Sequence, residues 1–314
     1  MADAKKDWNS GGAGGGGISK KEQKAAVAES LAAMIWRAAK SGTGKGSNET
    51  FQRLKSLRPA IVCTMAETQQ VQRSKEFRND GVTEFVVCTT CYKYEDLLET
   101  IKDELAMFMK KEGGGVVCLV YSCLLSRGLE NVASDMDTNF GQVPKMIGSH
   151  SYANQELVNL FLTGCATSNL FNGETRFEDE TGASADCVVM GGVGDVGDVG
   201  FVTLFEAYGT LEVGSNLKNP VAPVWVVCSE SHYSVLFSTV AEHVVAKEGD
   251  NVLDVYYFDP LGEQEGEIKL GLKTDDDMPD GPGDETDLIS PIDKVIRTKW
   301  NKVAVDWGKV DPIL

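Results

Sequence analysis

Hydrophobic side chains recur at helical spacing near the start of the chain. They form one stripe between residues 20 and 40, and Ser19 stands just before it, where its side chain can cap a first turn. The spacing therefore predicts a helix with one buried face. The expected core positions are Val27, Leu31, Met34, Ile35 and Ala38.

Three further segments of the first half have helical character. Residues 94–111 and 154–164 are amphipathic, and Gly164 is placed to end the second of these helices. The run "GVVCLVYSCLLSRG" at 115–128 is apolar on all sides, so it is either a buried helix or a buried strand. Its length favours a helix, and the alternative stays open.

Short β-branched and aromatic runs indicate strands, mostly in the second half. Two occur early, at 59–65 and 83–90, and three later, at 222–228, 233–239 and 253–259. The runs at 294–300 and 302–307 predict a final hairpin. Helices first and strands second predict an α+β fold, with a helix-rich N-terminal half and an antiparallel sheet in the C-terminal half.

Two segments lack a hydrophobic pattern. Residues 1–17 end in a glycine tract, which we expect to be disordered because it buries too little surface to offset its backbone entropy. Residues 274–288 are acidic and contain proline, and we expect a mobile loop there. The rest, 18–314, is expected to form one domain.

Charge and composition narrow the partners and the compartment. The net charge of -17 argues against nucleic acid and against an anionic membrane, and the longest apolar run, at 116–125, is about half the length of a membrane span. Eight cysteines without a secretory signal indicate free thiols in a reducing compartment. We therefore expect a cytosolic or nuclear protein with a protein or neutral small-molecule partner.

The cysteines offer two alternative chemistries. Cys88 and Cys91 form a C-x-x-C motif between a strand-like run and a helix, where a redox pair can occur. The βαβ surroundings of such oxidoreductases are missing, so we interpret the motif as structural. The remaining cysteines give no second pair at ligand spacing, and we expect no zinc site and no cofactor.

One histidine has a candidate partner. In the segment "VWVVCSESHYSVLFS" at 224–238, period-two geometry places His232, Ser234 and Leu236 on one strand face, away from Tyr233. A hairpin from this strand to "VYYFDP" brings Asp259 to within about two residues of His232. A carboxylate there fixes the imidazole tautomer and raises its basicity. Spacing alone also allows a structural histidine with a surface aspartate.

From about residue 24 onward, separated segments resemble the MINDY cysteine deubiquitinases, in the branch marked by Ser-Glu-Ser-His. These segments are "AAVAESLAAMIWRA", "LVYSCLLSRGLENVASDMD", "QELVNLFLTGCATSNLFNG", "GFVTLFEAYGTLEVGSNLKNP", "VWVVCSESHYSVLFS", "YYFDPLG", "IRTKWNKVAVDW" and "DPIL". Their number and common order make chance similarity a poor explanation.

The resemblance implies a papain-like fold and a thiol hydrolase that cuts isopeptide bonds in polyubiquitin, with a preference for chains that signal degradation. Its partners would be ubiquitin, polyubiquitin chains and ubiquitinated proteins. By position, His232 resembles the family's catalytic histidine and general base, while Asp259 as its orienting residue is inferred from hairpin geometry.

The chain departs from the family at the nucleophile. The family carries its cysteine in a segment like Gln-Gly-Gly-Pro-Cys ahead of the helix that corresponds to residues 20–39, and no Gly-Pro-Cys occurs here. Residues 18–314 would then be an N-terminally incomplete catalytic domain, inactive as given. Two explanations stay open: a truncated gene model, which the intact setting of His232 favours, or an inactive relative that binds ubiquitin as a scaffold.

Overall fold

The computed structural model describes most of the chain after residue 18. The described residues are 19–41, 58–68, 81–111, 113–138, 144–177, 188–244, 252–262, 264, 266–275, 277–283 and 289–312. The predicted disorder of 1–17 lies outside them, as do residues 276 and 284–288 of the predicted mobile loop at 274–288.

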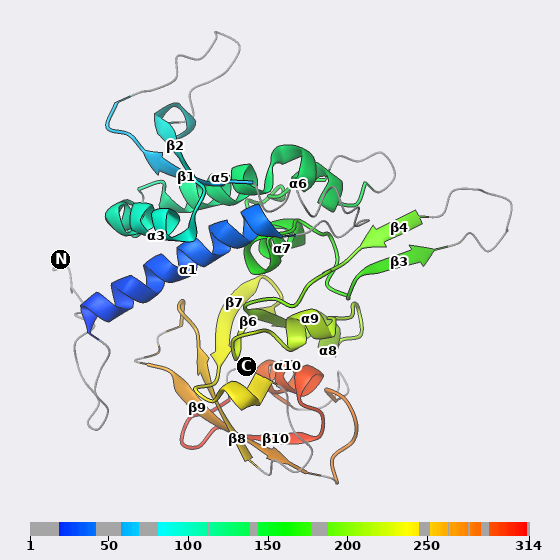
Figure 1. The fold of residues 1–314 in the computed structure, drawn as a ribbon. Coiled ribbons are helices and arrows are strands. Elements are labelled where there is room, and N and C mark those ends of the chain that lie inside the picture. The colour runs from blue at the N-terminus through cyan, green and yellow to red at the C-terminus, as the bar shows by residue number, and fades with distance from the viewer. Residues whose placement is uncertain are drawn as a thin grey trace, which may run out of the picture.

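Helices dominate the first half, where they surround one long helix (Figure 1). That helix is α1 (Lys20–Lys40), and a small antiparallel pair of strands, β1 (Ala60–Met65) and β2 (Val86–Cys91), lies beside it. The other elements are η1 (Thr83–Phe85), α3 (Tyr94–Asp103), α4 (Leu105–Phe108), α5 (Gly115–Arg127), α6 (Leu129–Asp135) and α7 (Gln155–Thr163).

Helix α1 begins at the predicted cap. The Ser19 side chain accepts a hydrogen bond from the amide of Glu22, and the Glu22 carboxylate accepts one from the amide of Ser19. The buried stripe is rotated relative to the prediction, because Val27 is exposed and small side chains occupy the centre. Alanine lets the neighbouring helices approach closely. The buried residues are Ala28, Ala32, Ile35, Ala38 and Ala39.

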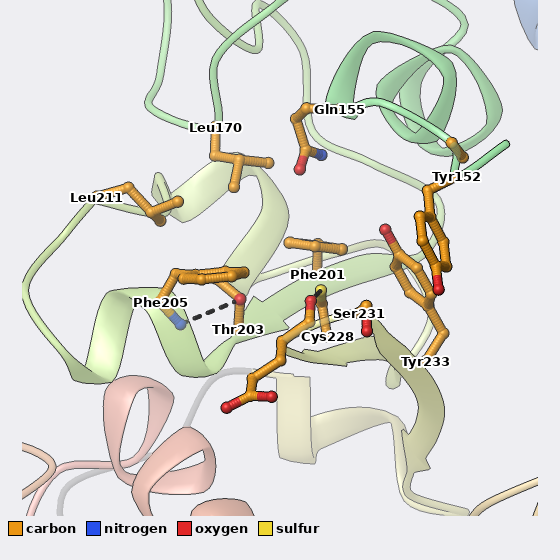
Figure 2. A pocket seen from close by; sticks show the side chains of 12 residues that line it. Tyr152, Gln155, Leu170, Phe201, Thr203, Phe205, Leu211, Cys228, Ser231 and Tyr233 are labelled. Carbon is orange, nitrogen blue, oxygen red and sulfur yellow. Dashed lines mark hydrogen bonds between the residues drawn. The ribbon is translucent and has the colours of Figure 1, made fainter. Parts of the chain in front are cut away.

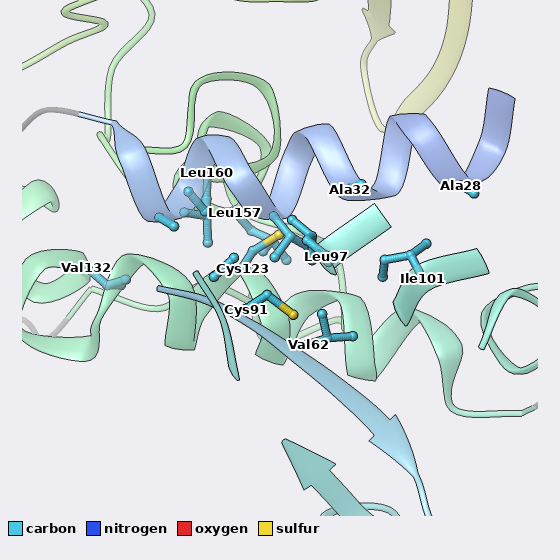
Figure 3. Packing of buried hydrophobic residues seen from close by; sticks show 14 of the residues in the cluster. Ala28, Ala32, Val62, Cys91, Leu97, Ile101, Cys123, Val132, Leu157 and Leu160 are labelled. Carbon is cyan, nitrogen blue, oxygen red and sulfur yellow. The ribbon is translucent and has the colours of Figure 1, made fainter. Parts of the chain in front are cut away.

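The ambiguous apolar run at 115–128 is the helix α5, as its length indicated. It packs against β1 and α1 in the first hydrophobic core, which is filled by residues such as Leu97, Ile101 and Leu160 (Figure 3). Within the described ranges no single helix is long and apolar enough to cross a membrane. Helices α5 and α6 pass that test only together, and the chain bends by 87° between them.

A six-stranded sheet dominates the second half. Its order is β10-β9-β8-β7-β6-β5, and all neighbours are antiparallel except β5 and β6, which are parallel. The strands are β5 (Gly200–Thr203), β6 (Val224–Ser229), β7 (His232–Phe237), β8 (Val252–Phe258), β9 (Ile268–Thr274) and β10 (Val303–Asp306). The predicted α+β fold is confirmed.

Shorter elements complete this half. They are β3 (Glu174–Phe177), which pairs with β4 (Val188–Gly191), and α8 (Leu204–Ala207), α9 (Ser215–Lys218), η2 (Ala241–Val244) and α10 (Pro291–Lys299). A second core lies between the sheet and α10, and it contains Trp225, Leu236 and Val295. A third core, which includes Phe201, lies between the sheet and the end of α7.

The predicted final hairpin is wrong in its first strand. Residues 294–300 belong to helix α10, and only the second run forms a strand, β10, which pairs with β9. Ser290 caps the helix by accepting from the amide of Asp293, and Pro291 opens the first turn. Burial of Ile292, Val295 and Ile296 follows helical spacing, which the β-branched composition concealed.

Candidate functional site

A two-residue turn places His232 at the start of β7. Strands β6 and β7 are paired up to Ser229 and His232, so only Glu230 and Ser231 connect them. Glu230 has φ of 56°, in the left-handed region, as such a tight turn needs at its first position. The imidazole therefore stands at the end of the sheet, on the same strand face as the buried Ser234 and Leu236.

Asp259 lies where the register of the next strand predicts. Val235 pairs with Phe258, so the first residue beyond β8 falls opposite Ser234, two positions from His232 and on the same strand face. The distance from His232 Nε2 to Asp259 Oδ2 is 2.8 Å. The prediction that hairpin geometry brings these two residues together is confirmed.

The aspartate is held as an acceptor for the imidazole. Its Oδ1 accepts from the amide of Leu261 at 2.9 Å, which leaves Oδ2 for His232. Partial burial opposes ionisation of Asp259, but the Leu261 amide and the His232 ring outweigh it and hold the pKa of the carboxyl below its usual range. The carboxylate is therefore charged at neutral pH.

The imidazole itself remains accessible. The His232 side chain is 40% exposed, whereas that of Asp259 is 12% exposed. Nε2 faces the carboxylate, and Nδ1 has no hydrogen-bond partner among the described residues. A carboxylate on one nitrogen and an open second nitrogen are the arrangement that a general base requires.

One further residue supports the pair, and no sequence pattern predicted it. Gln264 accepts a hydrogen bond from the amide of Asp259 through Oε1, at 3.0 Å. Its Nε2 is buried and has no partner within the described part of the chain. A glutamine five positions after an aspartate gives no sequence signal, because the contact depends on how the loop folds back.

No described cysteine forms a hydrogen bond with His232. The nearest in sequence, Cys228, pairs with Tyr233 across the hairpin and therefore faces the opposite side of the sheet. Burial raises the pKa of the Cys228 thiol, and its Sγ contacts the carbonyl oxygen of Glu230. Cys187 lies outside the described residues.

A cavity of about 270 Å³ lies on that opposite side. Figure 2 shows aromatic and aliphatic side chains around the strand face that carries Cys228: Phe201 of β5, Phe205 of α8, Leu211 after α8, and Tyr152 and Leu170 from the segments before and after α7. Its polar lining includes Gln155, Thr203 and Ser231. The cavity therefore neighbours the turn that carries His232 without including the imidazole.

The C-x-x-C motif does not form a thiol pair. Cys88 is exposed, whereas Cys91 is buried and contacts Thr100 on α3. Side chains three positions apart in a strand point to opposite faces, so β2 separates the two sulfurs. Within the described residues no group of three or more histidine, cysteine or acidic side chains is placed to hold a metal ion.

Comparison with known proteins identifies relatives. A probable ubiquitin carboxyl-terminal hydrolase MINDY-4 of Mus musculus is 38% identical over 258 residues, which cover 81% of this chain and 33% of the relative. The probable ubiquitin carboxyl-terminal hydrolase MINDY-4 of Homo sapiens is 35% identical over 286 residues, which cover 90% of this chain and 34% of the relative. A ubiquitin carboxyl-terminal hydrolase MINDY-3 of Bos taurus is 32% identical over 165 residues, which cover 51% of this chain and 34% of the relative.

The chain spans about a third of the length of these relatives. No solved structure matches it. The family model described as "Deubiquitinating enzyme MINDY-3/4, conserved domain" matches residues 15–309, and the chain therefore belongs to the MINDY-3/4 family.

Proposed function

We propose that this chain is part of a ubiquitin-directed thiol hydrolase in which His232 is the general base and Asp259 orients it. The single observation that carries the proposal is the 2.8 Å contact between His232 Nε2 and Asp259 Oδ2 beside an exposed imidazole, in a member of a deubiquitinase family. The MINDY-3 relative is named a ubiquitin carboxyl-terminal hydrolase, and the MINDY-4 relatives are named probable ubiquitin carboxyl-terminal hydrolases.

In the proposed mechanism, His232 Nδ1 takes the proton of a cysteine thiol. The thiolate attacks the carbonyl of ubiquitin's C-terminal glycine, and the imidazolium returns the proton to the departing lysine amine. Water then hydrolyses the acyl-enzyme, again with the imidazole as base. Asp259 holds the ring in one tautomer and stabilises its charged form throughout.

The test is cleavage of diubiquitin by a form of the protein that has measurable activity. His232→Ala should lower kcat/KM by roughly 100- to 10,000-fold, the usual contribution of a general base, with an unchanged circular dichroism spectrum. His150→Ala is the matched control, because His150 is also an exposed histidine and makes no hydrogen bond or ion pair with His232 or Asp259. Equal rates for the His232 variant and the parent would remove His232 from the mechanism.

The second candidate function is a ubiquitin-binding scaffold without catalysis. It is favoured by the fact that no described cysteine hydrogen-bonds to His232. A ubiquitin probe with an electrophilic C-terminus separates the two. We expect the 314-residue chain not to be labelled, and robust labelling at any of its eight cysteines contradicts that expectation.

Polyubiquitin of the degradation-signal type is the proposed substrate. Support for this part comes from the resemblance of the segments around His232 and Asp259 to the MINDY family. Cleavage of a panel of differently linked chains by the active form tests it. Equal rates on all linkages would leave ubiquitin as the partner and remove the linkage preference. We place this activity in the cytosol or nucleus, where thiols stay reduced.

A further inference from the structure

Strands β1 and β2 bring two cysteines together that are far apart in the sequence. Cys63 and Cys88 are direct partners in the antiparallel register, and their sulfurs are 3.5 Å apart. The pair is separate from the His232 site, which lies at the end of the six-stranded sheet.

The pairing has the backbone geometry that a disulfide accepts. The amides of Ile61 and Cys63 donate to Ser126 and Ser122 of α5, so these N–H groups point away from β2. Cys63 and Cys88 therefore form a non-hydrogen-bonded pair, in which the two Cα atoms lie about 4.5 Å apart and the side chains are close. This spacing falls within the range found for disulfides.

The two thiols differ in access. Cys88 is exposed, as are its neighbours Val87, Thr89 and Thr90, whereas Cys63 is fully buried between β2 and α5. An oxidant from solution therefore reaches Cys88 first, and Cys63 is placed to react only with the sulfur of Cys88 itself, after Cys88 has formed a mixed disulfide. This order distinguishes the pair from a single reactive surface thiol.

We propose that Cys63 and Cys88 form a thiol–disulfide site that is closed by a low-molecular-weight disulfide such as oxidised glutathione. The Cys88 thiolate attacks one sulfur of oxidised glutathione and releases one glutathione thiolate. Cys63 loses its proton, attacks the Cys88 sulfur and releases the second glutathione. Two protein thiols become one disulfide, one glutathione disulfide becomes two thiols, and the two released protons end on glutathione.

Burial makes the second step the slower one. Burial, together with the contact to Cys88, raises the pKa of the Cys63 thiol well above its ordinary value, so little thiolate is present at neutral pH. Closure is nevertheless intramolecular, and the reacting sulfurs already touch. The closed bond ties β2 to β1 across 25 positions, and β1 is in turn bonded to α5.

Two neighbouring thiols are the competitors that the experiment must separate. Cys91 points to the other face of β2, and Cys118 is buried on α5 close enough to Cys88 for its thiol pKa to be raised, mainly by burial and further by that neighbour. Neither is a register partner of Cys88. Cys118→Ala and Cys91→Ala therefore serve as matched controls.

The test uses the full 314-residue chain, reduced and then incubated with oxidised glutathione at neutral pH. After alkylation of the remaining thiols, peptide mapping without reductant should find Cys63 linked to Cys88, and dithiothreitol should remove the link. Cys63→Ala should stop at a glutathione adduct on Cys88, and Cys88→Ser should give no adduct at that position. The two control variants should form the same link as the parent.

The oxidised parent should also unfold several degrees higher than the reduced one, because the link restricts the unfolded chain. If Cys63→Ala does not fold, the peptide map of the oxidised parent chain is sufficient to test the proposal. A parent chain in which Cys88 stays unreacted, keeps its glutathione, or links to Cys91 or Cys118 overturns the proposal.

Discussion

At the scale of single residues, Asp259 links stability to pH. The hydrogen bonds from Leu261 and His232 outweigh partial burial and keep the pKa of the folded carboxyl below that of the unfolded chain. The stabilisation is therefore present above the unfolded pKa and is lost as the pH falls through the folded pKa.

Asp259→Asn measures this contribution. It should lower the free energy of unfolding at neutral pH by about 1.5 kcal/mol, the lower end of the usual range for a hydrogen bond to a charged group. The difference between parent and variant should begin to shrink as the pH falls through about 4, the ordinary aspartate pKa, and should be lost as the pH falls through the lower pKa of the folded carboxyl. Denaturant unfolding at several pH values checks this, and a difference that stays constant with pH contradicts it.

Lys299 is a second residue whose role follows from its contacts. Its Nζ donates to the carbonyl oxygens of Lys218 and Val244 and to Asn219, and it lies 4.8 Å from the ring centroids of both Trp225 and Trp300. Burial, together with the nearby Lys218 ammonium, lowers the pKa of the Lys299 amine to about 7. Three donated bonds require its protonated form, which these contacts therefore favour.

Lys299→Met should therefore destabilise the fold by about 2–4 kcal/mol, because it removes three hydrogen bonds to part-buried acceptors and two cation–π contacts. Lys269→Met is the matched control, since Lys269 makes an exposed ion pair with Asp254 and should leave stability nearly unchanged. Chemical denaturation of both variants compares them. Similar losses for the two lysines would mean that the aromatic surroundings contribute little.

At the scale of elements, the end of α7 shows why a glycine is needed. Gly164 has φ of 75°, and a Cβ there would lie 2.6 Å from the carbonyl oxygen of Arg37 on α1. Helix α7 can end against α1 only if this position has no side chain.

Gly164→Ala should destabilise the fold by about 3 kcal/mol, through backbone strain and the clash with α1. Gly173→Ala separates the two causes, because Gly173 has φ of 71° with nothing within 4 Å of the added Cβ, and it should lose only about 1 kcal/mol. Thermal unfolding of both variants gives the comparison. Equal losses would show that backbone strain alone explains Gly164.

The helices and strands also show which features of the fold local sequence patterns predict and which they do not. The strand at His232, the cap at Ser19 and the stop at Gly164 were predictable, because each depends on a local rule of periodicity or backbone conformation. Helix α10 was mistaken for a strand because its β-branched residues outweighed the cap at Ser290 and the helical spacing behind it. Contacts such as that of Gln264 depend on loop folding and have no local signature.

At the scale of the whole molecule, the mixed sheet and its covering helices are consistent with the papain-like α+β fold that the family resemblance implied. The helical half and the sheet have separate cores, and a third core joins them near Phe201. Arg37 of α1 adds a polar link, since its guanidinium contacts the Asp198 carboxylate and the Val196 carbonyl oxygen.

The net charge of -17 predicts a response to salt. Self-repulsion of like charges destabilises the compact state, and salt screens it. Raising NaCl from about 0.02 M to about 0.3 M near neutral pH should therefore raise Tm by a few degrees. The same change near the isoelectric point, about 4.6, should have little effect. A Tm that falls with salt at neutral pH contradicts this explanation.

The Glu230–Ser231 turn has a consequence for how this protein tolerates change. Because only two residues connect the strands, the turn fixes the register of β7 against β6 and therefore which side chains of β7 point to each face of the sheet. Insertion of a single residue that shifts the register by one would exchange the sides of His232 and Tyr233, turning the imidazole toward the cavity and away from its carboxylate. Length polymorphism at this hairpin would therefore be more damaging than most substitutions within it.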